Sequence, residues 1–203
     1  MDDNIQLSEL QHDAIVELLN IGMGSAASSL SEIVNEEIKL SVPSLELLYE
    51  QQVVEYFDAL SKEIVAIKQS FKGAFHGDAL LTFAQSKGMK LVSILMKHQV
   101  SIKELIELEA DAIKEIGNII LNSCLATCSN VLVKELITEI PVFMKGTAKD
   151  IFNNNKLTNI VLFLHVKFSL QHEDIDGYVA FILETSAIEQ LKVNIDRYLS
   201  ENT

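Results

Sequence analysis

The sequence is poor in several residue types, and each shortage excludes a class of protein. Its 203 residues include two prolines, two cysteines and no tryptophan. The two cysteines, Cys124 and Cys128, cannot build the framework of several disulfides that small secreted domains use. No apolar run reaches the roughly 18 residues of a membrane-spanning helix. The polar start, MDDNIQLSELQHD, lacks the apolar core of a secretion signal. These absences predict a cytoplasmic protein without membrane insertion.

Positive charge is also scarce. Lysine and arginine total 16 against 29 acidic residues, and the formal net charge is −13. A nucleic-acid-binding protein needs a positive patch that neutralises phosphates, and the sequence contains no basic run. Nucleic acid is therefore not an expected partner. Hydrophobic residues make up 48% of the chain, which is enough for the core of one domain or of two small ones.

One polar pattern occurs twice. The stretch DAIVELLNI begins at Asp13, and DAIKEIGNI begins 98 residues later at Asp111. The only two prolines, Pro43 and Pro141, have the same spacing of 98 residues. Matches in identical register at both a helix-like stretch and a proline indicate an internal duplication. We therefore predict one domain over residues 1–203 that consists of two repeats.

The two repeats are predicted to carry similar elements. The boundaries lie at about 8–98 and 106–201. Ser8 and Gln11 form the pattern of a capping box at the start of the first long helix. Apolar and β-branched runs predict the strands. The predicted helices are 8–35, 87–98, 102–133 and 186–199, and the predicted strands are 37–42, 45–57, 63–71, 74–84, 135–144, 157–170 and 175–184.

These elements predict an α+β fold. Strands that follow one another without intervening helices favour antiparallel pairing, so we expect one mainly antiparallel sheet with pseudo-two-fold symmetry, packed against helices. Three consecutive asparagines at 153–155 mark a loop. Gly22, Gly24 and Gly117 lie inside the two long helices, where glycine costs about 1 kcal/mol against alanine. We expect another element to approach each of them closely.

The repeated polar residues share one face of each long helix. Asp13, Glu17 and Asn20 lie at positions i, i+4 and i+7, within about 60° of arc. An isolated triplet of this kind is most often a solvated stripe of an amphipathic helix. Here the triplet is identical in both copies, although Val16 has become Lys114. Exposed residues that are kept while their neighbours change indicate a shared function.

The complete pattern resembles the signature of a known family. It reads Asp, three residues, Glu, two residues, Asn, 22 residues and Pro, and it is similar to that of the CheC/CheX/FliY phosphatases of bacterial and archaeal chemotaxis. The resemblance extends over nearly the whole chain, and the duplication is most similar to the CheC type within the family. Both copies fit, at Asp13, Glu17, Asn20 and Pro43 and at Asp111, Glu115, Asn118 and Pro141.

The resemblance implies hydrolysis of the aspartyl phosphate of a CheY-type response regulator. Mg²⁺ and a lysine would lie in the regulator's own active site, so this chain would need no intrinsic cofactor. Asn20 and Asn118 would orient the attacking water, because an amide can donate to and accept from it. Glu17 and Glu115 would pair with the regulator's lysine. Asp13 and Asp111 are assigned a supporting or capping role only, and Pro43 and Pro141 are assigned supporting roles.

A non-catalytic binding module is the alternative. Flagellar switch components share or adjoin this fold, and some family members act as partners of the deamidase CheD. The two intact Glu/Asn pairs favour the enzyme, because a scaffold would not need them. CheD remains open as a second partner, and two sites within one chain are compatible with a monomer.

Other polar residues predict no further chemistry. Cys124 and Cys128 lie one helical turn apart and are interpreted as small core residues rather than metal ligands. Between the copies, Gly117 replaces Leu19 beside the asparagine, which predicts more room, and a faster reaction, at the second site. The five histidines are scattered along the sequence, at His12, His76, His98, His165 and His172.

Overall fold

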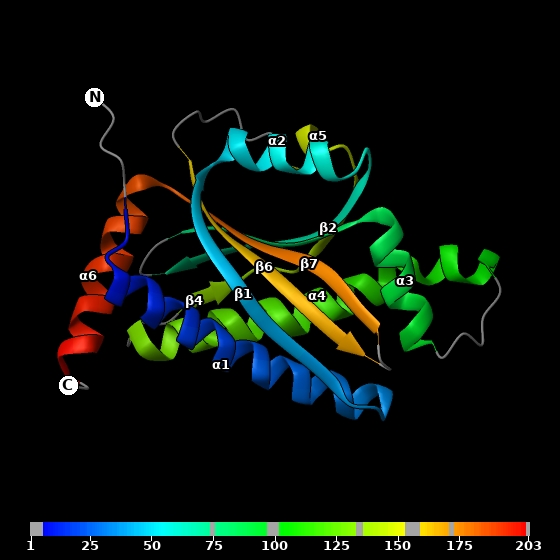
Figure 1. Ribbon diagram of the computed structural model, residues 1–203, viewed down its shortest axis with the longest axis horizontal. Coiled ribbons are helices and arrows are strands. Elements are labelled where there is room, and N and C mark those ends of the chain that lie inside the picture. Colours follow the sequence, from blue (N-terminus) through cyan, green and yellow to red (C-terminus); the bar gives the residue numbers. More distant parts are fainter. Residues whose placement is uncertain are drawn as a thin grey trace.

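The computed structural model describes residues 6–73, 76–96, 102–132, 136–152, 159–170 and 173–201. The predicted loop at 153–155 and two of the histidines, His98 and His172, lie outside these residues. The described part forms helices on both faces of a seven-stranded sheet (Figure 1). The helices are α1 (Glu9–Val34), α2 (Glu50–Leu60), α3 (Gln85–Leu95), α4 (Ile102–Leu132), α5 (Ala148–Phe152) and α6 (Thr185–Glu201).

All strand pairs in the sheet are antiparallel, as predicted, and the fold is α+β. The strands follow the order β1-β6-β7-β3-β2-β4, and β5 also pairs with β2. The first strand of each half therefore pairs with a strand of the other half. The strands are β1 (Ile38–Tyr49), β2 (Ile64–Gly73), β3 (Gly77–Ala84), β4 (Leu136–Thr138), β5 (Val142–Gly146), β6 (Ile160–Leu170) and β7 (Glu173–Leu183).

The pairing links the N-terminal and C-terminal halves of the chain. β1 pairs with β6 from the C-terminal half, and β4 and β5 pair with β2 from the N-terminal half. In the middle of the sheet β3 pairs with β7. Neither half could keep these backbone hydrogen bonds alone, because its outer strand lies on the other half. The boundaries of the two sequence repeats stay a prediction.

Helices cover the two faces of the sheet in pairs. The long helices α1 and α4 lie side by side on one face, and α2 and α5 cover part of the other (Figure 1). The larger apolar core lies between the long helices and the sheet, and includes Met23, Ile120 and Leu164. The smaller core lies under α2 and α5, where the rings of Phe57 and Phe152 stack with centroids 5.5 Å apart. This arrangement leaves the outer faces of α1 and α4 in solvent.

The start of α1 confirms the predicted capping box. The N–H of Gln11 donates to the Ser8 hydroxyl at 3.2 Å, and the N–H of Ser8 donates to the Gln11 side chain at 3.0 Å. Both bonds satisfy donors that a helix N-terminus otherwise leaves unpaired. Gln11 also donates to Asp196 on α6 at 2.8 Å. After the last helical residue, Val34, the C-cap is Asn35, whose φ of 55° is left-handed.

One predicted strand is wrong. The structure ends β1 at Tyr49 and begins α2 at Glu50, where the sequence pattern predicted a strand as far as residue 57. Val53 and Phe57 are both fully buried and lie four residues apart, which is the spacing of one helix face. The short helix α5 was not predicted either, since five residues are too few for a helical periodicity.

Two of the three helical glycines lie at close approaches, as predicted. A Cβ on Gly22 would lie 3.1 Å from the Cα of Cys124, so this glycine allows α1 and α4 to approach. A Cβ on Gly117 would lie 2.7 Å from Ile67, so α4 packs closely on β2. The prediction is wrong for Gly24, where a Cβ would meet nothing within 4 Å.

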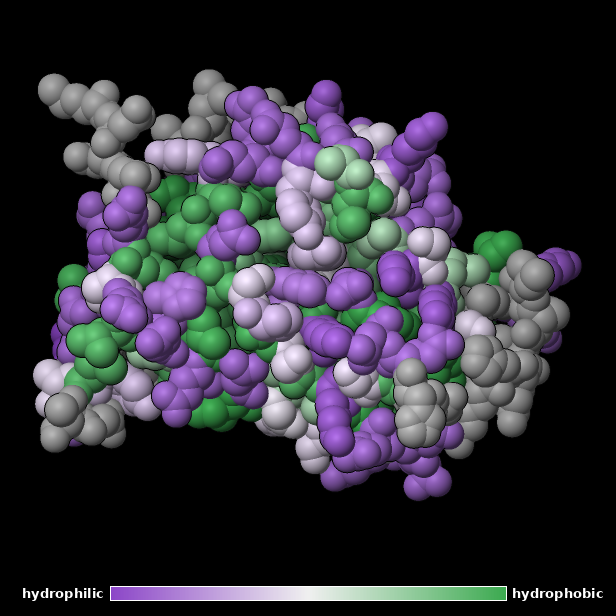
Figure 2. All heavy atoms as spheres, viewed as in Figure 1, coloured by the Kyte–Doolittle hydropathy of each residue, from purple (hydrophilic) through white to green (hydrophobic). Residues whose placement is uncertain are grey.

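The surface in the view of Figure 2 is mostly hydrophilic, in keeping with the net charge. Apolar side chains reach the surface mainly in an area between α6 and α2 (Figure 2). Among the residues that the structure describes, none of the helices combines the length and the hydropathy that a bilayer-spanning segment requires.

The contrast between two glycines gives a prediction for stability. Gly117→Ala should lower the free energy of unfolding by about 1–3 kcal/mol, because the new methyl group would overlap Ile67. Gly24→Ala should raise it by about 0.5–1 kcal/mol, because alanine is the better helix former in open space. Urea unfolding of both variants measures the difference. Equal effects would show that the close approach of α4 to β2 does not limit position 117.

Candidate functional site

The outer face of α1 carries the first predicted triplet. Asp13 and Glu17 are exposed, and Asn20 is half-buried at the side of the helix that faces β1. The carboxylate of Glu17 has no hydrogen-bond or ion-pair partner among the described residues. Asp13 lies 3.3 Å from a ring nitrogen of His12. Because α1 begins at Glu9, Asp13 lies within the helix and does not cap it, so the predicted capping role is wrong.

The asparagine of this face is held by an irregularity in β1. The register of β1 against β6 shifts between Ser41 and Ser44, so Val42 and Pro43 oppose the single residue Val166. This is a β-bulge, which releases the backbone from the regular ladder. The N–H of Val42 donates to Oδ1 of Asn20 at 3.0 Å. Pro43 has no N–H for the ladder, which suits it to this position.

The outer face of α4 carries the second triplet, and here a pocket is present. Asp111 and Glu115 are exposed and Asn118 is half-buried. A surface pocket is lined by these three residues together with Lys114 and Pro141. The structure therefore brings all four predicted residues of the second copy together. Asp111 lies well inside α4, which begins at Ile102, so it is not a helix cap.

A chain of side-chain amides holds Asn118. Its Oδ1 accepts a hydrogen bond from Nδ2 of Asn122 at 2.8 Å. Oδ1 of Asn122 accepts from Nε2 of Gln69 at 3.0 Å, and the same Nε2 donates to the backbone carbonyl of Glu139 at 3.2 Å. Gln69 is on β2 and is almost completely buried. The four groups connect the interrupted edge of the sheet to the helix surface.

The irregularity beside the second site resembles the one beside the first. β4 ends with Thr138 opposite Phe71, and β5 begins with Val142 opposite Lys68. Residues 139–141 therefore oppose residues 69–70, which again leaves one extra residue on the strand that carries the proline. The spacing from asparagine to proline is therefore the same in both copies because each asparagine lies on a helix beside a bulge that contains the proline.

Both arrangements leave the same group free. In each asparagine Oδ1 accepts a bond from within the chain, and the described residues provide no partner for Nδ2. Glu17 and Glu115 lie one turn before Asn20 and Asn118, so each face offers a carboxylate and an amide N–H₂ about 5 Å apart along the helix. Such a face can pair with a cation and donate to an oxygen of a bound group.

Several residues of the site were not predicted. Lys114 was treated as a neighbour that had drifted between copies, but it lines the pocket with Glu115. Gln69 could have been noticed as a polar residue at an inward position of the apolar strand EIVAIKQSF. The hydrogen bond from the Val42 N–H to Asn20 could not be predicted from the sequence, in which the only indication is the proline that follows Val42.

The prediction that Gly117 makes more room beside Asn118 is wrong. Gly117 and Leu19 are both buried, and the missing Cβ of Gly117 points at Ile67 on β2 rather than at the outer face of α4. The glycine therefore makes no room for a partner beside Asn118. The two sites differ instead in their rims. Ile140 is 80% exposed at the second bulge, while Val42, at the equivalent position, is only 5% exposed.

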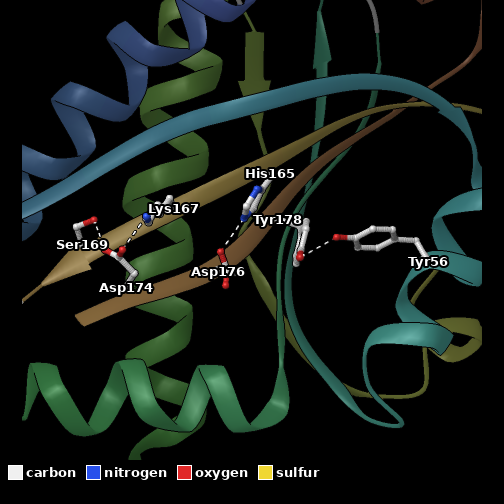
Figure 3. A network of polar contacts seen from close by, with 7 residues as sticks. All are labelled: Tyr56, His165, Lys167, Ser169, Asp174, Asp176 and Tyr178. Atoms are coloured by element: carbon white, nitrogen blue, oxygen red, sulfur yellow. Dashed lines mark hydrogen bonds and ion pairs between the residues drawn. The ribbon is translucent and has the colours of Figure 1, made fainter. Parts of the chain in front are cut away.

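A second polar cluster lies on the opposite face of the sheet (Figure 3). Asp174 accepts from Lys167 at 2.6 Å, and this bond and a further one from Ser169 hold the pKa of the carboxyl below its usual value. His165 contacts Asp176 at 2.8 Å. The acids and bases of this cluster pair with one another, so it offers no free group for catalysis. Its members are Tyr56, His165, Lys167, Ser169, Asp174, Asp176 and Tyr178.

The two cysteines lie on α4 in the region where α1 packs against it. Cys124 is fully buried, and its backbone contacts Gly22 of α1. Within the described residues no three histidine, cysteine, aspartate or glutamate side chains gather as a group that could hold a metal ion. Burial raises the pKa of the Cys128 thiol to about 11 and raises that of Cys124 further.

Comparisons with known proteins point to one family. The sequence model of the CheC-like family matches residues 10–47, which contain the whole first copy of the motif. The "Flagellar motor switch phosphatase FliY" of Bacillus subtilis is 28% identical over 132 residues, or 64% of this chain and 34% of FliY. The "CheY-P phosphatase CheC" of the same organism is 25% identical over 139 residues, or 66% of each chain.

Solved structures show the same fold. The chain superposes on FliY from Thermotoga maritima with a TM-score of 0.77 and 20% identity, covering 96% of this chain and 100% of that one. The middle domain of FliM from H. pylori gives a TM-score of 0.67 at 14% identity, with 93% and 99% covered. At these identities the likeness concerns the fold alone.

The fold and the site together define an α+β protein whose two long helices each expose an Asp, Glu and Asn triplet beside a bulged strand. The predicted resemblance to the CheC/CheX/FliY family is confirmed by the family match, by the two curated relatives and by the fold. The chain spans about a third of the FliY relative and about two thirds of the CheC relative.

The raised pKa values predict slow thiol chemistry. Near pH 8 an alkylating reagent should label Cys128 and Cys124 at least about 100-fold more slowly in the folded protein than in denaturant, because only the thiolate reacts. The rate for Cys128 should rise as the pH approaches 11. Labelling followed by mass spectrometry measures both rates. Fast labelling of the folded protein near neutral pH would contradict the burial of Cys124 and the raised pKa of Cys128.

Proposed function

We propose that the chain is a phosphatase of a phosphorylated CheY-type response regulator, with one site on α1 and one on α4. The observation that carries the proposal is that each long helix has an exposed glutamate and, one turn later, a half-buried asparagine. Oδ1 of each asparagine accepts a hydrogen bond from within the chain, which orients the amide. The printed names of the FliY and CheC relatives, both called phosphatases, support it. A cytoplasmic location goes with this substrate.

The proposed chemistry needs little from this chain. In phosphoryl transfer, catalysis rests on positioning and on neutralising charge rather than on covalent steps by the protein. The regulator would bring its aspartyl phosphate together with Mg²⁺ and a lysine, so the phosphatase would add no cofactor of its own. Nδ2 of Asn20 or Asn118 would donate to the attacking water and hold its oxygen in line with the phosphorus.

The structure refines the expected role of the amide. An asparagine that both donates to and accepts from the water would need its Oδ1 as well as its Nδ2. In both sites one lone pair of Oδ1 already accepts a bond, from Val42 N–H or from Asn122. The donor is therefore wholly available and the acceptor is partly used. The proposal accordingly assigns the water to Nδ2.

The glutamates serve docking in this proposal. Glu17 and Glu115 are exposed and have no partner among the described residues, so each can pair with a lysine of the regulator at its active site. At the second site Lys114 lines the same pocket, and it can pair with an acidic group of the partner. Each helix face would bind one regulator, because each offers a single Glu/Asn pair.

A binding role without catalysis is the second candidate. The observation in its favour is Ile140, which is 80% exposed and directly precedes Pro141, a residue that lines the second pocket. An exposed apolar side chain beside a polar pocket is typical of a protein interface. The fold of the FliM middle domain is also similar. CheD stays a proposal for a second partner.

Removal of the asparagines tests the catalytic proposal. Asn20→Ala and Asn118→Ala should each lower the rate at which phosphorylated regulator decays, and the double variant should reduce it by about 10²-fold or more, to the rate of the regulator alone. Circular dichroism and thermal unfolding serve as controls for the fold. If the double variant keeps wild-type activity, the asparagines do not orient the water. If wild-type protein never accelerates the decay, the binding role is favoured.

Charge reversal of the glutamates tests docking separately from chemistry. Glu17→Lys combined with Glu115→Lys should weaken binding of the phosphorylated regulator about tenfold or more, because two cations would face each other. Salt should weaken wild-type binding modestly for the same reason. A titration by calorimetry or fluorescence measures the Kd. Reversal of Glu9, which is in the first turn of α1, is the matched control, and an unchanged Kd in the double variant would exclude the ion pair.

A further inference from the structure

We propose that Gln69 and Asn122 are positioning residues of the second site, which form a directional amide relay that turns Nδ2 of Asn118 outward. The first site obtains the same orientation from the backbone N–H of Val42 and needs no relay. This inference rests on the proposed function, since it concerns how that site is prepared. It assigns roles to two residues that lie outside the repeated motif.

The direction of the relay is set at its buried end. The carbonyl of Glu139 can only accept, so the group of Gln69 that lies 3.2 Å from it must be the Nε2 donor. That same Nε2 lies 3.0 Å from Asn122, which must therefore present Oδ1 to it. Asn122 then has Nδ2 on its other side, and this atom donates to Asn118 at 2.8 Å. Each amide fixes the next, and the last one offers Nδ2 to solvent.

The first site orients its asparagine without a relay, because the residues that would form one are absent there. The residue in the place of Asn122 is Gly24, 98 positions earlier, and the residue opposite the first bulge is the fully buried Val166. No amide chain can form from a glycine and a valine. Instead the bulge directs the N–H of Val42 at Asn20, and a backbone N–H can only donate. Both routes end with a donor on Oδ1 of the asparagine.

Stability alone does not explain the buried glutamine. Gln69 is 1% exposed, and its Oε1 has no hydrogen-bond partner in the described part of the chain. A buried acceptor without a partner costs about 1–3 kcal/mol, which offsets the net contribution of about 0.5–1.5 kcal/mol from each of the two bonds that Nε2 donates. Its neighbours on the inward face of β2, Ile67 and Phe71, are apolar. A polar group kept at such a cost is expected where its orientation has a function.

Aspartate at position 122 tests the direction of the relay. Asn122→Asp keeps the shape of the side chain, but both carboxylate oxygens accept, from Gln69 on one side and from Nδ2 of Asn118 on the other. Asn118 would then turn Oδ1 outward. Asn122→Ala removes the donor and lets Asn118 take either orientation. A residue that only fills space would tolerate the isosteric aspartate better than alanine, whereas the relay requires the reverse order.

The rates are measured in an Asn20→Ala background, in which only the second site acts. With phosphorylated regulator, Asn122→Ala should lower kcat by about two- to tenfold and Asn122→Asp by about tenfold more, with KM little changed because Glu115 is intact. If Asn122→Asp is as active as Asn122→Ala or more active, the relay is wrong. The same holds if KM rises while kcat is unchanged.

Gly24→Asp is the matched control for the added charge. It places a carboxylate at the equivalent position of the first site, in an Asn118→Ala background, and a Cβ at this position meets no atom within 4 Å. Since Val42 N–H holds Asn20, kcat should stay within about twofold of its parent. A loss as large as that of Asn122→Asp would attribute both effects to charge and overturn the relay.

A readout without catalysis separates this inference from the proposed function. In ¹⁵N spectra the side-chain amide signals of Asn118, identified by their loss in Asn118→Ala, should shift in Asn122→Asp and stay in place in Gly24→Asp. Gln69→Met provides a second variant should Asn122→Asp not fold: it removes the donor to Asn122, so the Asn118 signals should shift. Unshifted signals in these variants would overturn the relay. An inactive wild-type protein would reject the phosphatase proposal and leave the spectroscopic result decisive for the relay.

Discussion

The interruption of the sheet beside each long helix is the constraint on which the rest of the site depends. In a regular ladder the N–H of Val42 and the carbonyl of Glu139 would be consumed by neighbouring strands. The extra residue next to Pro43 and Pro141 releases them, and they reach toward the helices that cross over the sheet. A flexible amide at a helix surface thereby becomes a group with a defined direction. The exposed glutamate one turn earlier then lies beside an amide of fixed orientation.

This constraint requires α1 and α4 to lie close to the sheet and to each other. Gly22 allows the helices to approach, and Gly117 allows α4 to pack on Ile67. The two halves of the chain also exchange their outer strands, so the bulge beside α1 lies between β1 and β6, and the bulge beside α4 lies between β2 and the β4–β5 segment. Each site therefore contains backbone that both halves of the chain hold in place. The two sites form as parts of one sheet rather than as two separate units.

The two faces are equal in their motif and unequal in their surroundings. Both present Glu and Asn, yet one orients the asparagine through the backbone and the other through side chains. The second also has Lys114 in its pocket and an exposed Ile140 on its rim, where the first has Val16 and the buried Val42. The exposed Glu and the Asn one turn later are the same in both copies. The groups that support them could diverge, because a donor to Oδ1 can come from more than one source.

The sequence by itself determined the parts that depend on local periodicity. The capping box at Ser8, the long helices and the shared face of Asp13, Glu17 and Asn20 follow from spacing along a single helix. The duplication was visible because identity in register needs no structure. The helix α2 was missed because its burial by Val53 and Phe57 depends on α5 and the sheet beneath it. Only the tertiary structure decided what touches the asparagines, since Val42 lies 22 residues from Asn20 and Gln69 lies 53 residues from Asn122. Contacts over such distances arise from strand pairing and helix packing, which no local pattern encodes.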